Sequence, residues 1–152
     1  MRALTSVTTT YWPDGVTKKT ETVVDEDGNE HGTQMQWYED GSVKMLREMR
    51  HGAYHGVNRW YSHVCCVIEK TYVDNMEQGE EIRRWWDTGA IRRRVVWNQG
   101  RQVGTAYMWW KNGQMALEDE GGYGITRRWL RNGVETDRRE WIDELIREES
   151  NH

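Results

Sequence analysis

Phenylalanine is absent from this chain of 152 residues, and proline occurs once, at Pro13. Its aromatic content therefore consists of ten Trp and seven Tyr. A hydrophobic fraction of 36% beside a charged fraction of 30% is low for a compact globule. A single domain of this length can still bury roughly two thirds of the surface that its unfolded chain exposes. The composition predicts one domain with a large surface and little depth.

Long hydrophobic runs are also missing. No stretch approaches the ~20 apolar residues that are needed to span a bilayer. The first residues, MRALTSVTTTYW, lack the apolar centre of a signal peptide. We therefore expect a cytoplasmic protein that makes no membrane contact.

Cysteine is scarce, and the two cysteines, Cys65 and Cys66, are adjacent. A disulfide between neighbours would be strained, so we expect two reduced strand residues that face opposite ways. The candidate metal ligands in the sequence are His51, His55, His63 and Cys65. The HxxxH spacing favours zinc on a helix, whereas here it spans the turn GAYHG. No metal or cofactor is expected.

Catalytic signatures are missing as well. The chain has no Ser-His-Asp arrangement, P-loop or dinucleotide fingerprint, because the glycine pairs in GNEHG (28–32) and GRQVG (100–104) recur at repeat spacing and open no helix. Carboxylate pairs such as Glu80 and Glu81 stand beside arginines and are typical of solvated charge. The sequence therefore predicts no enzymatic activity.

What the chain does have is a repeated phrase. WYEDG (37–41) returns as WWDTG (85–89) and WWKNG (109–113). The pairs that start these phrases are Tyr11-Trp12, Trp37-Tyr38, Trp60-Tyr61, Trp85-Trp86, Trp109-Trp110 and Trp129-Leu130, spaced 26, 23, 25, 24 and 20 residues apart. A glycine follows three positions after the pair in five of the six copies, and Val64 replaces it in the third. A period of this size indicates a repeat fold.

Each unit of about 24 residues contains two runs and two turns. The runs 42–50, 90–97 and 105–110 are rich in β-branched and aromatic residues, as strands are. The segments EDG, KNG and RNG are typical of hairpin turns, because Asp-Gly and Asn-Gly tolerate positive φ angles. We predict five to six β-hairpin repeats in residues 1–135, paired edge to edge in an elongated, antiparallel, mostly β sheet.

Residues 136–150, TDRREWIDELIREES, differ from the repeats. Their apolar side chains, Trp141, Ile142, Leu145 and Ile146, fall at helical spacing. Thr136 or Asp137 can cap the first turn. The segment predicts a short amphipathic α-helix that caps the terminal edge of the sheet.

The repeats resemble the MORN-variant repeats of the YwqK family of bacterial antitoxin-like proteins, over roughly residues 9–133. The resemblance rests on the WYxxG, WWxxG and WLxxG phrases, on the apolar residue two positions past each, and on the His before the second glycine in NEHG (29–32) and AYHG (53–56). It implies stacked hairpins, no cofactor and action through protein binding. We therefore expect a protein that binds and blocks a protein partner, as an antitoxin, an immunity protein or a phage-encoded inhibitor does.

Charge is distributed unevenly along the chain. Residues 82–131 carry 10 Lys/Arg against 4 Asp/Glu, whereas residues 1–81 carry 8 against 14 and residues 132–152 carry 3 against 7. This basic middle favours an acidic protein partner, or pairing with Glu118, Asp119 and Glu120. The net charge of −4 and the pI near 5.8 disfavour nucleic acid, because nucleic-acid-binding domains more often have a pI above ~9.

Two adjacent aromatics in a strand point to opposite faces of the sheet. Both columns of aromatics can therefore be structural ladders, or one column can be an exposed binding surface in which Trp and Arg dominate the interaction energy. The candidate partner-binding residues are Trp86, Trp110, Arg83, Arg84, Arg92, Arg94 and Arg127. Two alternatives stay open: a nucleic-acid or nucleotide-binding module that uses the Trp/Arg surface of residues 82–131, and a structural scaffold. We expect a monomer or, through the open edge of the first hairpin, a homodimer.

Overall fold

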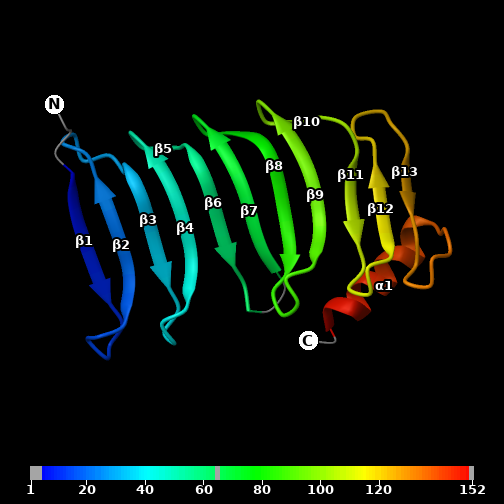
Figure 1. The fold of residues 1–152 in the computed structure, drawn as a ribbon, viewed down its shortest axis with the longest axis horizontal. Helices are drawn as coiled ribbons and strands as arrows, with labels where there is room; N and C mark the ends of the chain where they lie inside the picture. The colour runs from blue at the N-terminus through cyan, green and yellow to red at the C-terminus, as the bar shows by residue number, and fades with distance from the viewer. Residues whose placement is uncertain (1–4, 64–65, 151–152) are drawn as a thin grey trace.

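The computed structural model describes residues 5–63 and 66–150. These residues form one open antiparallel sheet of 13 strands and one C-terminal helix. Hairpin follows hairpin along the long axis of the molecule, with the helix at one end (Figure 1). The predicted mostly β fold of paired hairpins with a C-terminal helix is therefore confirmed.

The strands lie side by side in nearly the order of the chain. They are β1 (Ser6–Tyr11), β2 (Lys18–Val24), β3 (Gly32–Trp37), β4 (Val43–Arg50), β5 (Ala53–Tyr54), β6 (Gly56–Tyr61), β7 (Cys66–Val73), β8 (Met76–Trp85), β9 (Ile91–Asn98), β10 (Arg101–Gln102), β11 (Ala106–Trp109), β12 (Met115–Asp119) and β13 (Thr126–Arg128), followed by α1 (Arg138–Ser150). The short strands β5 and β10 pair with β4 and β9 and lie off the main path. The runs predicted at 42–50, 90–97 and 105–110 correspond to β4, β9 and β11.

The hairpin turns have the predicted glycine geometry. After β3, the amide of Tyr38 donates to the carbonyl of Ser42 at 2.8 Å, and Gly41 donates back to Tyr38 at 3.0 Å. Gly41 has a φ of 85°, which a residue with a side chain rarely adopts. The turns before β12 and after β13 repeat this pattern. The Asp-Gly and Asn-Gly phrases therefore work as turns.

The hydrogen bonds across these turns also define which residues are equivalent. Within the described chain the amide donors at the start of the six turns are Trp12, Tyr38, Ser62, Trp85, Trp110 and Leu130. The frame predicted from the aromatic pairs is therefore wrong by one residue in the third and fourth repeats. Relative to its turn, Trp60 lies one position earlier than the aromatic pairs predict, because the donor there is Ser62 and not Tyr61. Trp86 lies in the turn after β8 rather than in a strand.

A β-bulge recurs beside the turn and fixes which face each aromatic occupies. Within the described residues, four hairpins leave one residue without a cross-strand partner, at Lys19, Lys44, Arg92 and Ala116. The three cations lie over the ring of the turn aromatic of their own repeat: Lys19 over Trp12 at 4.7 Å, Lys44 over Tyr38 at 5.7 Å and Arg92 over Trp85 at 4.6 Å. The fourth position carries alanine, and α1 packs there.

Helix α1 lies on one face of β11 and β12. Trp141 packs against Trp110, with ring centroids 6.3 Å apart, and against the small side chain of Ala116. Met108, Leu117, Ile142 and Leu145 surround this core. We call the face that carries Arg92, Trp110 and Ala116 the helix face, and the opposite face, which carries Arg94, Trp109 and Arg127, the open face. The helix thus packs over the last hairpins on one face of the sheet, rather than along its edge.

The edge beyond β13 is instead covered by the chain as it returns. The amide of Thr136 donates to the carbonyl of Arg128 at 2.9 Å, and Trp129 forms a bridge with Glu135. Asp137 then caps α1, since its carboxylate accepts the amides of Arg139 and Glu140 at 2.8 and 3.0 Å. Among the described residues no helix has the length and apolar character needed to cross a membrane.

Candidate binding surface

The residues predicted to bind a partner separate onto different surfaces. Strand alternation and pairing place Arg83, Arg92 and Trp110 on the helix face, and Arg84, Arg94 and Arg127 on the open face. Trp86 lies in the turn after β8. The structure therefore does not bring the seven residues together in one site.

The expectation that Trp110 belongs to an exposed column of aromatics is wrong. Only 2% of it is exposed, because α1 covers its position. Its indole N–H donates to the carbonyl of Trp129 in the next repeat at 2.8 Å, just as Trp12 donates to the carbonyl of Trp37 at 3.3 Å. This column joins successive repeats and has a structural role. Trp86, by contrast, is 45% exposed, beside Tyr61 and Val67 in a shallow cavity of about 350 Å³.

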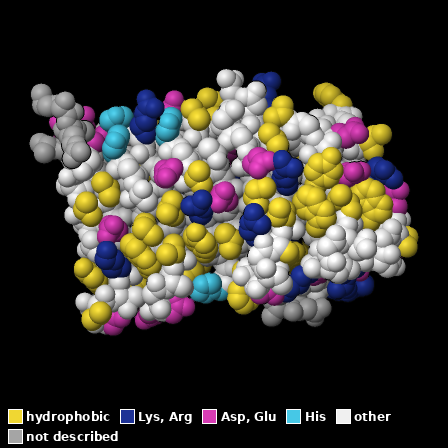
Figure 2. Space-filling model, viewed as in Figure 1, with side chains coloured by type: hydrophobic (Ala, Val, Ile, Leu, Met, Phe, Trp, Pro, Cys, Tyr) yellow, Lys and Arg dark blue, Asp and Glu magenta, His cyan; other side chains and the backbone are white. Residues whose placement is uncertain are grey.

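The open face combines apolar side chains with paired charges (Figure 2). Arg94 forms an ion pair with Glu80, and Arg127 binds both carboxylate oxygens of Glu135 at 3.0 Å. Hydrogen bonding to Glu135 raises the pKa of the Arg127 guanidinium. Arg84 donates to the carbonyl of Gly89 in its own turn at 3.2 Å. Each of these arginines therefore already has a partner within the protein.

The helix face contains a buried carboxylate that the sequence did not reveal. Glu81 was expected to be solvated, but it is only 1% exposed. Its carboxylate lies 2.7 Å from Arg83 Nε, 3.2 Å from Lys70 Nζ and 3.9 Å from Arg93 Nη1. The Trp97 indole also donates to it at 3.0 Å. We call these five residues the Glu81 cluster.

The charge state of the Glu81 cluster follows from these contacts. Burial by itself raises the pKa of Glu81, but the hydrogen bond and charge of Arg83 and the charge of Lys70 outweigh burial and hold the pKa below its usual value. Burial and the nearby charge of Arg83 lower the pKa of the Arg93 guanidinium. Glu81 is therefore ionised at neutral pH, and the fold disfavours the charge on Arg93.

Two members of the Glu81 cluster, Arg83 and Arg93, belong to a row of side chains that crosses the helix face. Successive strands pair Met45 with Trp60, Trp60 with Ile68, Ile68 with Arg83, Arg83 with Arg93, Arg93 with Met108 and Met108 with Leu117. We call these seven residues the central row. Its last two members lie under α1, whereas Arg83 and Arg93 keep 33% and 28% of their side chains exposed. A small cavity of about 200 Å³ opens beside Met45, Trp60 and Ile68.

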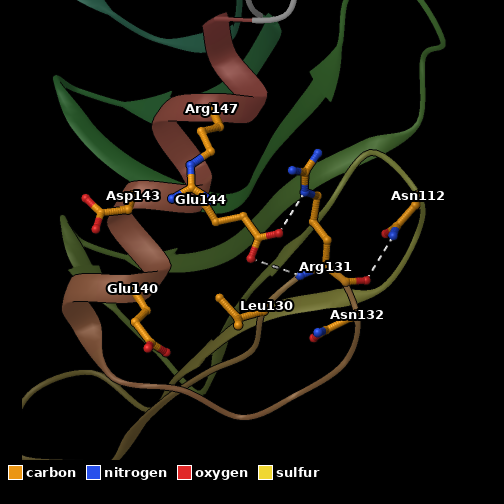
Figure 3. Close-up of a pocket in the computed structure, with 8 residues that line it drawn as sticks. All are labelled: Asn112, Leu130, Arg131, Asn132, Glu140, Asp143, Glu144 and Arg147. Atoms are coloured by element: carbon orange, nitrogen blue, oxygen red, sulfur yellow. Dashed lines mark hydrogen bonds and ion pairs between the residues drawn. The ribbon is translucent and has the colours of Figure 1, made fainter.

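Helix α1 shows what the helix face can bind. Its acidic side chains contact basic or amide groups of the sheet: Glu149 pairs with Arg92, Glu148 accepts the amide of Lys111 at 3.0 Å, and Glu144 pairs with Arg131 at 2.9 Å. Figure 3 shows Glu144 joined to Arg131 in the lining of an open cavity of about 620 Å³ between α1 and the turn after β13. Hydrogen bonding to Glu144 raises the pKa of Arg131. The helix face thus holds an acidic amphipathic helix of its own chain.

The histidines named from the sequence do not form one metal site. His63 lies beside Tyr38 and Ser42, and His55 pairs with Asp74 at 3.2 Å. Cys65 and the predicted turn position Val64 lie outside the described residues, while Cys66 is a buried residue at the start of β7. His51 is close to two residues that sequence reasoning did not select, Asp25 and His31.

Comparison of the chain with protein-family models and with curated proteins finds no match. The resemblance to MORN-variant repeats therefore stays a prediction that rests on the repeated phrases. Sequence reasoning also did not select Glu81, Lys70 and Trp97 as members of a site. The only signal for them was the recurrence of charged and aromatic residues within runs that alternate between two faces.

Proposed function

We propose that the protein is a non-catalytic binding module that takes an acidic, amphipathic segment of a protein partner on its helix face. The main support for this proposal is that α1 packs on part of the helix face and leaves the adjoining part of that face exposed. The helix uses Glu149 against Arg92 and Trp141 against Trp110. The next strands present Arg83 and Arg93 in the same central row.

The uncovered part of the central row has the chemistry that such a segment needs. Met45, Trp60 and Ile68 offer apolar contact, and Trp is a frequent anchor of protein interfaces. Three cations of the Glu81 cluster, Lys70, Arg83 and Arg93, form ion pairs with two acids, Glu81 and the neighbouring Glu77. A carboxylate from a partner would offset the remaining positive charge. The charge pattern therefore favours an acidic partner over a basic one.

The proposed consequence of binding is inhibition of the partner, as by an antitoxin, an immunity protein or a phage-encoded inhibitor. This part of the proposal rests on the resemblance of the repeats, and its proposed setting is the cytoplasm. A sheet joined by aromatic side chains between repeats is a preorganised surface, which lowers the entropy cost of covering a partner site. The proposal holds for a monomer and for a homodimer.

Nucleic acid is the competing ligand for a surface of Trp and Arg. The arrangement of charges disfavours it, because Lys70, Arg83 and Arg93 already surround a buried carboxylate. Arg94 and Arg127 are likewise paired with acids on the open face. A phosphate backbone would compete with these internal acids at each contact.

Affinity capture from cell lysate tests the proposal, with the bound material measured by mass spectrometry and by its 260/280 nm absorbance ratio. We expect one protein in stoichiometric amount and no nucleic acid. The paired change Arg83→Gln with Arg93→Gln should abolish capture, whereas Arg94→Gln with Arg127→Gln on the open face should preserve it. Circular dichroism confirms that both variants fold. Nucleic acid without a stoichiometric protein, or equal loss in both variants, would overturn the proposal.

A further inference from the structure

A second cluster lies at one edge of the sheet, away from the helix face and from α1. Asp25 follows β2, His31 precedes β3 and His51 follows β4. One ligand atom from each residue lies within 4.8 Å of the others. Histidine side chains are visible along this edge in Figure 2, over the turns that join β2 to β3 and β4 to β5. The turns of two successive repeats therefore meet at this point.

Asp25 is held in place by its own turn. Although it is acidic, it is only 5% exposed. One carboxylate oxygen, Oδ1, accepts the amides of Asn29 at 2.9 Å and Asp27 at 3.1 Å. The other oxygen, Oδ2, lies 2.7 Å from Nδ1 of His51. The turn thus fixes one oxygen and directs the other toward an imidazole.

Backbone contacts also position the two histidines. His51 has a φ of 47°, a left-handed conformation that is uncommon for a residue with a side chain. The next residue, Gly52, donates its amide to the carbonyl of Glu30 at 2.8 Å, which ties this turn to the preceding repeat. Nδ1 of His31 accepts the amide of His51 at 3.2 Å, and the two imidazole centroids are 4.5 Å apart. The backbone of both repeats therefore brings the rings together.

We propose that Asp25, His31 and His51 form a binding site for a divalent transition-metal ion, with Zn²⁺ as the first candidate. Two imidazoles and one carboxylate are ligands that Zn²⁺ and its first-row neighbours share. The His51 side chain is 61% exposed, so water can complete the coordination. Because the ligands come from turns of two repeats, the bound ion links these repeats and stabilises the folded state by mass action.

The next pair along the same edge provides a matched control within the chain. His55 Nδ1 lies 3.2 Å from Asp74 Oδ1, the same pairing that joins His51 to Asp25. The other ring nitrogen of His55 lies 3.5 Å from the guanidinium of Arg50, so the neighbour of this ring is a cation, whereas the neighbour of His51 is a second imidazole. Two ligands beside a cation should not retain a divalent ion.

Calorimetric titration of the metal-free full chain with ZnCl₂ tests the proposal. We expect one Zn²⁺ per chain and a rise in the thermal unfolding midpoint. Asp25→Asn, His31→Ala and His51→Ala should each weaken binding by at least about tenfold, a loss typical of a removed ligand or its supporting partner. His55→Ala and His63→Ala should bind as the wild type does.

A spectroscopic readout complements the titration. Co²⁺ added in place of Zn²⁺ should give visible absorption bands that depend on His31 and His51 and not on His55. Circular dichroism of each metal-free variant establishes that the hairpins remain folded. Absence of Zn²⁺ binding at millimolar concentration, or a binding curve that survives both His31→Ala and His51→Ala, would overturn the site.

Discussion

Arg83 and Arg93 lie directly opposite each other on β8 and β9, and both extend toward the buried carboxylate of Glu81. Like charges in this position destabilise a sheet. Burial and the charge of Arg83 lower the pKa of Arg93, so the folded state disfavours its positive charge. The pair therefore contributes little to stability, and an anionic partner would relieve the repulsion between its members.

The first prediction concerns Arg93 alone. Arg93→Met removes the repelled charge and keeps much of the length of the side chain, so the free energy of unfolding should stay unchanged or rise by up to about 1 kcal/mol. Urea denaturation of the wild type and the variant measures the difference. A loss of about 2 kcal/mol or more, as in the breaking of a buried pair, would show that Arg93 is needed to balance Glu81, contrary to its lowered pKa.

Glu81 should have the opposite effect. Glu81→Gln leaves Lys70, Arg83 and Arg93 without their shared counter-charge, and breaking a buried ion pair costs about 3–5 kcal/mol of unfolding free energy at pH 7. The pKa of Glu81 is lowered in the folded state, so its stabilisation is present above the unfolded pKa near 4.5 and is lost as the pH falls through the folded value. Denaturation curves should therefore separate the two proteins at pH 7 and converge at low pH. A difference in unfolding free energy that stays constant with pH would contradict the conclusion that ionised Glu81 stabilises the fold.

The third prediction distinguishes two tryptophans that the repeated phrase treats alike. Trp110→Ala should cost about 3–5 kcal/mol of unfolding free energy and release α1, because the buried ring packs against Trp141. Trp86→Ala, in an exposed turn, should change stability by no more than about 0.5 kcal/mol. Thermal unfolding and hydrogen exchange of α1 measure both effects. Equal costs for the two substitutions would place Trp86 in the core.

The fourth prediction concerns Gly56, the first residue of β6. Gly56 has a φ of 106°, and a Cβ there would clash with the carboxylate of Glu48, which accepts the amide of Val57 at 2.7 Å. Gly56→Ala should therefore cost roughly 1–3 kcal/mol through strain and loss of this contact. Gly89→Ala is the control, because Gly89 also has a positive φ but open space where a Cβ would stand. Gly89→Ala should cost less unfolding free energy than Gly56→Ala. A larger loss for Gly89→Ala in urea denaturation would contradict the close approach of Gly56 to Glu48.

The parts of the fold that the sequence could predict are those set by local chemistry. Gly41 and Gly113 mark turns because the backbone there needs a positive φ, which any hairpin of this length requires. The spacing of Trp141 and Leu145 predicts α1 because a helix brings such residues to one face. The uneven charge did not predict that the acidic α1 of the same chain would contact the basic middle at Arg92 and Arg131.

The features that were missed depend on pairing between strands. The register that sets Glu81 opposite Lys70 on one side and Val95 on the other is not visible in either strand alone. The longer turn after β8 moved Trp86 out of its predicted strand position, because the repeated phrase does not show where the strand stops. His31 and His51 meet only because consecutive hairpins align their turns.

The most direct test of an acidic partner segment on the helix face is a fluorescence anisotropy titration of the full chain with two labelled probes. One probe is an acidic amphipathic peptide with the sequence of residues 136–150, and the other is a single-stranded oligonucleotide of similar length. We expect the peptide to bind with an affinity that falls as salt is added. Binding should be lost in Arg83→Gln with Arg93→Gln and kept in Arg94→Gln with Arg127→Gln. Tighter binding of the oligonucleotide, or peptide binding that does not depend on Arg83 and Arg93, would contradict the proposed function.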